Sequence, residues 1–311
     1  TAIGHTALDS NTTASNNTAM GYGALGVNST GSENVAIGRN CLDANTTGAD
    51  NTAIGNSALG GNTTASNNTA VGSAALLANT TGASNTSVGH TASQSITTGS
   101  SNTTLGKQAG GSLTTGDNNI AIGNSAMDHG INTTTGNQNI IIGDYSDMSA
   151  VGGSNQTVLG YNVTCVGNGN FTFGDGTVDS NIANGATTIT APSDVRLKEE
   201  IQDEVVGLNF INELRPVTFR WKKAKDVPPE MKVHDPDSEE RVMNGKYNHG
   251  FVAQEVKEVI DRYDLKDGFD MWTEDETDGR QRIGEASLMP LMVKAVQELS
   301  AKVEDLEDKL K

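Results

Sequence analysis

The 311-residue chain has few cysteines, few aromatic residues and, over its first half, almost no positive charge. Its two cysteines, Cys41 and Cys165, lie far apart, which excludes a disulfide framework and suggests small buried residues in a reducing compartment. Up to Ser193 the composition is dominated by Asn, Thr, Gly, Ala and Ser, with ten acidic residues against only Arg39 and Lys107. This half lacks the large apolar side chains of a globular core. It must therefore bury small residues by repetition.

Eight glycines recur at a constant interval of 17 residues, and each closes a short apolar run. The glycines are Gly4, Gly21, Gly38, Gly55, Gly72, Gly89, Gly106 and Gly123, and the runs are TAIG, TAMG, VAIG, TAIG, TAVG, TSVG, TTLG and IAIG. An asparagine begins each complete run, and an alanine, often followed by leucine, comes three residues after most of the glycines. The pattern continues as IIIG, TVLG and FTFG, the first after an insertion of three residues. Such a period is typical of a repeat architecture.

A period of this length fits one coil of a β-solenoid. We expect two short strands per coil, each about three to five residues long, joined by turns rich in Asn, Gly, Ser and Thr. Coils roughly 4.8 Å apart would give a rod on the order of 50 Å long for about ten coils. The repeat glycine would permit a positive φ or a close backbone approach. Because the inward residues would be only Ala, Ile and Val, we expect several chains to associate about an axis.

Other features of the repeats have simpler explanations in turn chemistry. Asn-Thr-Thr and Asn-Ser-Thr match glycosylation sequons, but they occupy the turns. Regular threonines could form an ice-binding face, but no clear Thr-x-Thr column lies on one strand. His5 and His90 follow repeat glycines as solvent-facing turn residues, and no His-x-His sequence indicates an axial metal site. Because the chain begins in the middle of a repeat, we expect it to be a fragment of a longer protein.

Residues 144–193 break the period but keep the strand-like pieces QTVLG, NFTFG and ATTIT. We expect this region to be the distal end of the rod or a narrow triple-stranded extension of it. It would become the C-terminal tip if the downstream part of the chain were removed.

From Asp194 onward charged residues are frequent and both tryptophans appear, which indicates an α+β domain. VVGLNFINELRP predicts a helix with Leu208, Ile211 and Leu214 on one stripe. VTFRWK predicts a strand, and residues 223–248 predict a polar excursion. HGFVAQEVKEVIDRY predicts a short buried strand followed by a helix.

Residues 287–311 predict a long helix whose apolar residues alternate in steps of three and four, a heptad stripe of about three heptads. After Met289, the residues that would form a coiled coil, here called the seam residues, are Met292, Val296, Leu299, Val303, Leu306 and Leu310. The alternative is a helix packed on its own domain, but a charged tail of this kind has no local surface to cover. We therefore expect self-association, and a trimer would match the solenoid.

Two parts of the chain resemble known protein families. The apolar runs of residues 1 to about 143 resemble the SVAIG repeats of trimeric autotransporter heads, a β-roll, and related repeats of phage tail fibres; the period here is longer, so only the trimeric solenoid is implied. The motifs SDVRLKEEI, GLNFINELRPVTFRWK, HGFVAQEV and LMPLMVKAVQEL resemble, in this order, the C-terminal intramolecular chaperone domain, also called peptidase S74, of phage tailspikes, tail fibres and neck appendage proteins. The resemblances imply three regions: a fibre shaft (1–143), a distal region (144–193) and a chaperone domain (194–311).

The second resemblance implies that the domain trimerises, aligns three copies of the upstream β-structure, and then cuts itself off between Ser193 and Asp194. Ser193 and Lys198 match the family's serine–lysine dyad. A serine hydroxyl is a weak nucleophile until a base removes its proton, and lysine serves as that base only if desolvation lowers its pKa. Burial of Lys198 at an interface formed on assembly would couple cleavage to trimerisation. From these residues alone, the alternative is a solvated lysine and a Ser193 that caps a helix.

The position of the cleaved bond raises a chemical difficulty. A serine that attacks its own carbonyl would form a four-membered ring, so cleavage after Ser193 requires a neighbouring chain's serine, an activated water or a rearrangement. Transfer of the Pro192 acyl group to the Ser193 hydroxyl would be easier. The family pattern favours the bond from Ser193 to Asp194. His249, Gly250, Phe251 and Gln254 match the family's strand and helix motif, and we assign them to the trimer clamp, with contact to the fibre end as the alternative.

Three classes of function follow. The leading hypothesis is a phage tail fibre or spike fragment, structural and receptor-binding, whose only enzymatic activity is a serine endopeptidase activity on its own chain. The second is a spike that also degrades a polysaccharide, with a catalytic domain outside this chain, because no glycosidase carboxylate pair is evident in the repeats. The third is a trimeric surface adhesin, which would need a membrane-spanning C-terminal domain where this chain has a charged helix.

We expect the partners to be two further copies of the chain, a host cell-surface receptor of glycan or outer-membrane type, and other virion tail proteins. The site of action would be the virion tail fibre, after assembly in the host cytoplasm. We expect no cofactor and no metal. The net charge of −17 argues against nucleic acid, and no apolar stretch approaches the length of a membrane span.

Overall fold

The computed structural model describes residues 1–131, 134–177, 179–186, 189–190, 193–265, 271–274 and 279–310. The chain divides into two compact units, Thr1–Leu197 and Lys198–Lys311.

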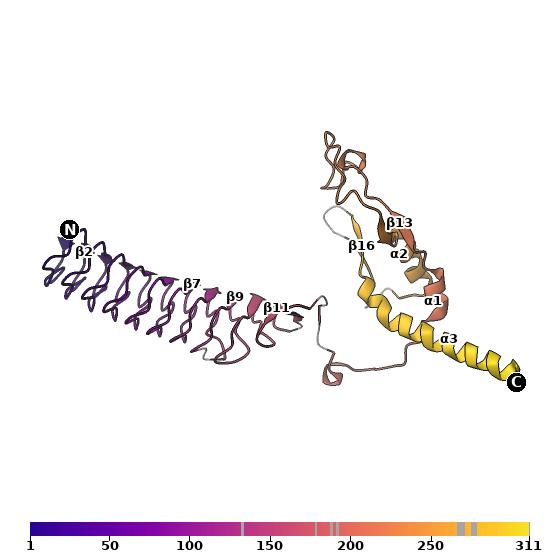
Figure 1. Ribbon diagram of the computed structural model, residues 1–311, viewed down its shortest axis with the longest axis horizontal. Helices are drawn as coiled ribbons and strands as arrows, with labels where there is room; N and C mark the ends of the chain where they lie inside the picture. The colour runs from indigo at the N-terminus through magenta and orange to yellow at the C-terminus, as the bar shows by residue number, and fades with distance from the viewer. Residues whose placement is uncertain are drawn as a thin grey trace. The chain divides into compact units, whose positions relative to one another are not determined.

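The first unit is a β-solenoid, as the period predicts, and its coils follow one another along the unit (Figure 1). Its sheet has twelve strands in sequence order: β1 (Ala2–Ile3), β2 (Thr18–Met20), β3 (Val35–Ile37), β4 (Thr52–Ile54), β5 (Thr69–Val71), β6 (Thr86–Val88), β7 (Thr103–Leu105), β8 (Ile120–Ile122), β9 (Ile140–Ile142), β10 (Thr157–Gly160), β11 (Asn170–Gly174) and β12 (Ser180–Ala183). Strands β1 to β11 are parallel, and in the regular coils partners lie 17 residues apart, as Ala36 and Ala53 do. The three-residue insertion lies between β8 and β9, where Ile120 pairs with Ile140.

The prediction of two strands per coil is wrong, because each coil holds one. After the repeat glycine, the backbone alternates into the left-handed region: Ser57 has a φ of 54° and Leu59 a φ of 51°. Hydrogen bonds between coils nevertheless continue, from Ser57 N–H to the Arg39 carbonyl and from Leu59 N–H to the Ala75 carbonyl, both at 2.9 Å. A left-handed leucine costs about 1–2 kcal/mol, which its burial offsets. The sequence pattern alone does not reveal this conformation.

The interior of the solenoid also differs from the predicted set of Ala, Ile and Val. The middle residue of each strand, usually Ala, points inward, and it packs with the left-handed leucines Leu25, Leu42, Leu59 and Leu76. The third residue of each strand, an Ile, Val, Met or Leu in β2 to β10, is exposed or half-buried. An alternating strand can bury only one of its faces, so the larger apolar side chains lie outside.

Two ladders of buried asparagine side chains run between the coils. In the first, Asn34, Asn51 and their copies each donate from Nδ2 to a carbonyl in the next coil, and each Oδ1 accepts the backbone N–H of the next asparagine. In the second, Asn45, Asn62 and Asn79 donate to the Oδ1 of the preceding copy. These bonds satisfy amides whose unpaired burial would cost several kcal/mol.

The second ladder ends where a hydrocarbon side chain replaces asparagine. The position after Asn79 is Ile96, which has no side-chain donor. As a result, Asn79 Oδ1 is the one buried side-chain nitrogen or oxygen without a hydrogen-bond partner in the described part of the chain. The ladder is therefore complete only inside a run of identical coils.

The repeat glycines are required where coils meet. Gly55 has a φ of +140°, and a Cβ at this position would lie 2.4 Å from the carbonyl oxygen of Gly72. Any other residue would therefore both strain the backbone and force the neighbouring coil away.

The coil that follows the insertion contains a buried carboxylate. Asp147 occupies the column that holds leucine in the regular coils, and its two oxygens accept the backbone N–H groups of Met148 at 2.8 Å and Ile131 at 3.0 Å. It thereby anchors the inserted turn. Burial, and to a smaller extent the charge of Asp128, raises the pKa of Asp147 to about 7, against the lowering effect of these hydrogen bonds.

The solenoid ends with strand β12, which pairs antiparallel to β11 and closes the parallel stack. The strand-like pieces predicted at QTVLG and NFTFG are β10 and β11, whereas Thr187 and Thr188 of ATTIT lie outside the described residues. Cys41 and Cys165 are both buried and unpaired, and burial raises the pKa of the Cys41 thiol to about 12.

The second unit contains α1 (Leu208–Glu213), β13 (Val217–Phe219), β14 (Asn248–Gly250), α2 (Ala253–Arg262), β15 (Trp272–Glu274), β16 (Gln281–Ile283) and α3 (Leu288–Leu310), with short 3-10 turns η2 (Ala224–Asp226) and η3 (Glu285–Ser287). Strands β13 and β14 form one antiparallel pair, and β15 and β16 form another. The core joins Phe210 and Leu214 to Val256, Ile260 and Leu291, together with Val259, Met271 and Leu288.

Two predictions for this unit need correction. Helix α1 has six residues, and its fully buried side chain is Phe210, whereas Leu208 and Ile211 of the predicted stripe are half-buried. Phe210 meets Tyr263 edge to face, with ring centroids 5.2 Å apart, so the helix is held against the end of α2. Strand β14 is not buried, because it pairs only with β13.

We predict that Asn51→Ala destabilises the solenoid by about 1–3 kcal/mol in free energy of unfolding, because it leaves the buried Asn68 N–H without its acceptor and removes one of the two side-chain donors to the Ala65 carbonyl. The control Asn56→Ala removes an exposed amide and should change stability by less than about 0.5 kcal/mol. Denaturant unfolding followed by circular dichroism measures both. Equal effects of the two substitutions would contradict a structural role for the ladder.

We also predict that the stability of the solenoid falls as pH rises through about 7, the raised pKa of Asp147. Between pH 3.8, the ordinary aspartate pKa, and about 7, Asp147 is protonated in the folded chain and ionised in the unfolded chain. The free energy of unfolding therefore decreases with pH across this range and reaches its lower value once Asp147 is ionised in both states. Melting temperatures measured from pH 5.5 to 8 should show this step in the wild type and in the exposed-site control Asp9→Asn. The prediction fails if the step persists in Asp147→Asn.

Candidate functional site

The predicted cleavage junction is an exposed segment with one short turn. Every residue from Ser193 to Glu200 is exposed, and a three-residue 3-10 turn, η1 (Val195–Leu197), follows Asp194. Asp194 Oδ1 accepts the backbone N–H of Arg196 at 2.9 Å, and its carbonyl accepts that of Leu197 at 3.0 Å. Within the described residues 193–207 no α-helix forms. The helix in the alternative reading of these residues is thus limited to one 3-10 turn, whereas its solvated lysine agrees with the exposure of Lys198.

The carboxylate of Asp194, next to the predicted cleavage bond, is paired with the guanidinium of Arg196. Arg196 Nε donates to both carboxylate oxygens of Asp194, at 3.0 and 3.1 Å. This pairing holds the pKa of Asp194 below its usual range and raises that of Arg196. Because the carboxylate stays ionised, it cannot donate a proton to a departing amine near neutral pH. The sequence motifs alone did not single out Arg196, although an opposite charge two residues from Asp194 was a usable signal.

The two residues of the predicted dyad belong to different units of the structure, Ser193 to the first and Lys198 to the second. Both side chains are exposed. A lysine activates serine only when its ammonium form is destabilised by burial or by nearby positive charge. One chain by itself supplies no such burial for Lys198.

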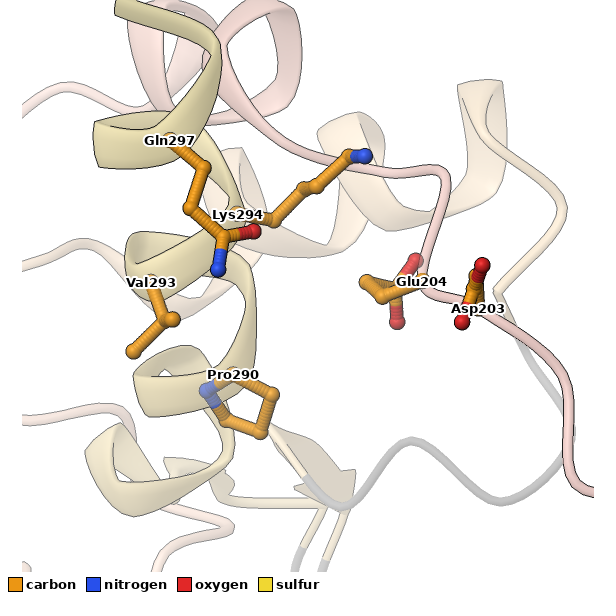
Figure 2. Close-up of a pocket in the computed structure, with 6 residues that line it drawn as sticks. All are labelled: Asp203, Glu204, Pro290, Val293, Lys294 and Gln297. Atoms are coloured by element: carbon orange, nitrogen blue, oxygen red, sulfur yellow. The ribbon is translucent and has the colours of Figure 1, made fainter. Parts of the chain in front are cut away.

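The segment that follows Lys198 is anchored on helix α3. Leu208 N–H donates to Glu298 Oε2 at 2.9 Å, and the Gly207 backbone lies against the side chains of Lys294 and Glu298. Upstream of this anchor, Asp203 and Glu204 face α3 across a cavity of about 460 Å³ (Figure 2). Its other lining residues are Pro290, Val293, Lys294 and Gln297 of α3. Helix α3 therefore holds the C-terminal end of the segment that begins at Lys198.

Helix α3 has two apolar stripes. Leu288, Leu291 and Ala295 are buried and face the core of their own unit. The seam residues form a different stripe, and their exposed fractions lie between 46% for Val303 and 88% for Leu310. Helix α3 therefore packs on its own unit, as the alternative expects, but through Leu288, Leu291 and Ala295 and not through the seam residues. A single chain leaves the seam residues uncovered.

The strand and helix motif comprises β14 and the start of α2. His249 is in register with Thr218 of β13, and its Nδ1 lies 3.2 Å from Thr218 Oγ1. Phe251 packs against the core of the unit, and Gln254 is exposed on α2. The assignment of these residues to a trimer clamp stays a prediction.

Comparison with known families identifies this part of the chain. The family model described as chaperone of endosialidase, peptidase S74, matches residues 193–265, which comprise the junction, α1, β13, β14 and α2. The chain carries a domain of the endosialidase chaperone family. The match begins at Ser193, and the domain points to a protein of the tail-fibre type. No curated protein and no solved structure gives a significant match.

The described residues form neither a membrane-spanning helix nor a metal-binding cluster. None of their helices combines the length and the apolar character that a membrane crossing needs. They also hold no group of three or more His, Cys, Asp or Glu side chains arranged to bind a metal ion.

Proposed function

We propose that this chain is part of a phage tail fibre or spike whose C-terminal domain trimerises, sets the register of three solenoids, and then releases itself by cutting the bond between Ser193 and Asp194. The observation that carries the proposal is the position of the family match, which begins at Ser193 directly downstream of the β-solenoid. A chaperone placed there can act on the solenoid as a folding aid and need not remain in the finished fibre.

The outer face of the solenoid sheet supports self-association. We call the outward-pointing residues of β2 to β11 the strand face. They are Thr18, Met20, Val35, Ile37, Thr52, Ile54, Thr69, Val71, Thr86, Val88, Thr103, Leu105, Ile120, Ile122, Ile140, Ile142, Thr157, Leu159, Phe171 and Phe173. None is charged, in a chain of net charge −17. A partner that covers this face along its whole length must repeat with the same spacing, and a second copy of the chain has that property.

The exposed seam of α3 supports the same assembly from the other unit. Three helices with apolar residues at a and d positions would bury this stripe in a coiled coil. Because α3 also anchors the segment after Lys198, docking of the three helices would change the surroundings of that lysine. This link gives a physical route by which assembly controls cleavage.

The cleavage reaction would be a hydrolysis that consumes one water per chain. With Lys198 as base, water would attack the Ser193 carbonyl directly, or the Ser193 hydroxyl of a neighbouring chain would attack it to form an ester that water then hydrolyses. On either route the C–N bond to Asp194 would break. The amino group of Asp194 would take the released proton. An acyl shift from Pro192 would cut one residue earlier, so the mass of the product distinguishes the routes.

Fibre attachment to a host receptor completes the proposal, with other virion tail proteins as neighbours in the mature particle. The chain would be assembled in the host cytoplasm before its incorporation into the tail. We assign no external substrate to the serine–lysine pair.

We predict that the wild-type chain is recovered as residues 1–193 and 194–311, whereas Ser193→Ala and Lys198→Ala stay whole, because they remove the hydroxyl that attacks on the serine route and the lysine that acts as base on either route. A Ser193→Ala chain that still cuts would show that water attacks directly. Intact mass under denaturing conditions measures this. Lys246→Ala removes an exposed lysine of the same unit and should cut normally. An uncut wild-type trimer would refute self-release and leave the domain as a permanent clamp.

We predict that Leu299→Glu prevents trimer formation and slows cleavage together, because it places three carboxylates in the seam. Leu299 is half exposed in one chain, so the fold of the unit itself should survive. Ala301→Glu adds the same group two residues away, at an exposed position outside the seam. Light scattering and intact mass report assembly and cleavage. A monomeric Leu299→Glu chain that cuts at the wild-type rate would contradict the coupling.

A further inference from the structure

The aromatic residues of the solenoid gather where its period is broken. Of the five Phe, Tyr and Trp residues in positions 1–190, Tyr145, Tyr161, Phe171 and Phe173 lie within 30 residues of one another, and only Tyr22 is elsewhere. The same region holds the one insertion among the coils from β1 to β10, between β8 and β9. In repeat proteins, insertions in single repeats often form the binding surface.

Three rings from this region form a continuous cluster. His129 of the inserted turn meets Tyr145 with ring centroids 4.9 Å apart, and Tyr145 meets Tyr161 at 6.0 Å, both edge to face. The coils that carry the two tyrosines are joined by the hydrogen bond from Asn162 N–H to the Asp144 carbonyl, at 2.9 Å. We call His129, Tyr145 and Tyr161 the aromatic cluster. Tyr161 is 59% exposed, and His129 is exposed as well.

This cluster lies beside the strand face rather than on it. Tyr161 directly follows a repeat glycine, and the equivalent positions in other coils hold Arg39, Lys107 and Asp144. Burial of such charges between identical chains would remove their water without supplying a partner charge, which is unfavourable. The column that contains Tyr161 therefore stays in contact with solvent when the uncharged strand face is covered.

The polar groups around the rings suit a ligand rich in hydroxyl groups. Asp144 precedes Tyr145, and its Oδ1 accepts the N–H of Asn124 at 2.7 Å, which fixes the carboxylate while its second oxygen can accept a further hydrogen bond. Asn162 follows Tyr161 and is exposed. A pyranose presents C–H groups on its faces and hydroxyls at its edge, which matches exposed rings beside a carboxylate and an amide.

The charge of the region restricts the ligand further. No Lys or Arg occurs between Lys107 and Arg196, whereas Asp117, Asp128, Asp144 and Asp147 all do. Anionic sugars are bound through Arg and Lys, and here they would be repelled. From the rings, the fixed carboxylate and this charge, we propose that the aromatic cluster with Asp144 and Asn162 is a binding site for a neutral glycan. This inference rests on the proposed receptor-binding role and names the ligand class.

The test is binding of the assembled wild-type protein to an array of immobilised neutral, sialylated, sulfated and phosphorylated glycans. We expect signal on neutral glycans, a loss of about tenfold or more in affinity for Tyr161→Ala and Asp144→Asn, and retention in Tyr22→Ala. Tyr22 is a matched control: it follows a repeat glycine, is 56% exposed and stacks on His5, with no Asp beside it. Circular dichroism and light scattering confirm that each variant remains folded and assembled.

Three results would overturn the inference: binding confined to anionic glycans, wild-type affinity in Tyr161→Ala, or an equal loss in Tyr22→Ala. A protein that assembles and cuts itself but binds no neutral glycan would refute the glycan site and leave the chaperone and fibre proposal intact. A chain that neither trimerises nor cuts itself would refute that proposal before any glycan is added.

Discussion

The fold of the first unit depends on hydrogen bonds between successive coils, which repeat the same glycine and asparagine positions. Backbone groups pair across coils on both sides of the repeat glycine, and buried asparagines add side-chain bonds to the same direction. These bonds replace the large apolar core that the composition cannot supply. Where the next coil lacks the asparagine, a hydrogen bond is lost: the buried amide oxygen of Asn79 lies beside Ile96 and has no partner. The stability of such a rod is a sum over neighbouring coils rather than a property of one core.

The same repetition makes the register between chains ambiguous. If several chains pair along their strand faces, a shift by one whole coil recreates nearly every contact, so the free energy difference between correct and shifted assemblies is small. A clamp at one end removes the ambiguity, because it aligns the chains before the non-local contacts form and lowers the entropy cost of forming them. Removal of the clamp afterwards leaves a rod that cannot readily unfold and pair again, which makes its stability kinetic. A disposable chaperone domain is therefore the expected companion of a regular solenoid.

The sequence predicted the period, the solenoid, the position of the insertion and the domain at the C-terminus, because these leave marks at fixed spacing. It did not predict that Leu59 and its copies adopt a left-handed backbone, since glycine and asparagine are the usual signals of that conformation and leucine gives none. This one conformation removes the second strand and brings leucine into the interior in place of the third residue of each strand. Ser193 and Lys198 were identified by motif alone. Their surroundings could not be predicted, because both side chains are exposed in one chain and, in our proposal, Lys198 is buried only on assembly.

The cleavage junction and the glycan site that we propose both lie where the repeat is interrupted. A residue inside a regular coil is held by its copies on both sides, so a new side chain there must fit the ladder before it can bind anything. The inserted turn relaxes that restriction. Asp147 stands in the leucine column and binds the backbone of the inserted turn. His129 of this turn contacts Tyr145, which in turn contacts Tyr161. The junction at Ser193 is the other interruption, where the solenoid has ended and the exposed backbone is open to attack. The proposed sites of recognition and release thus lie in the two segments that depart from the regular coil.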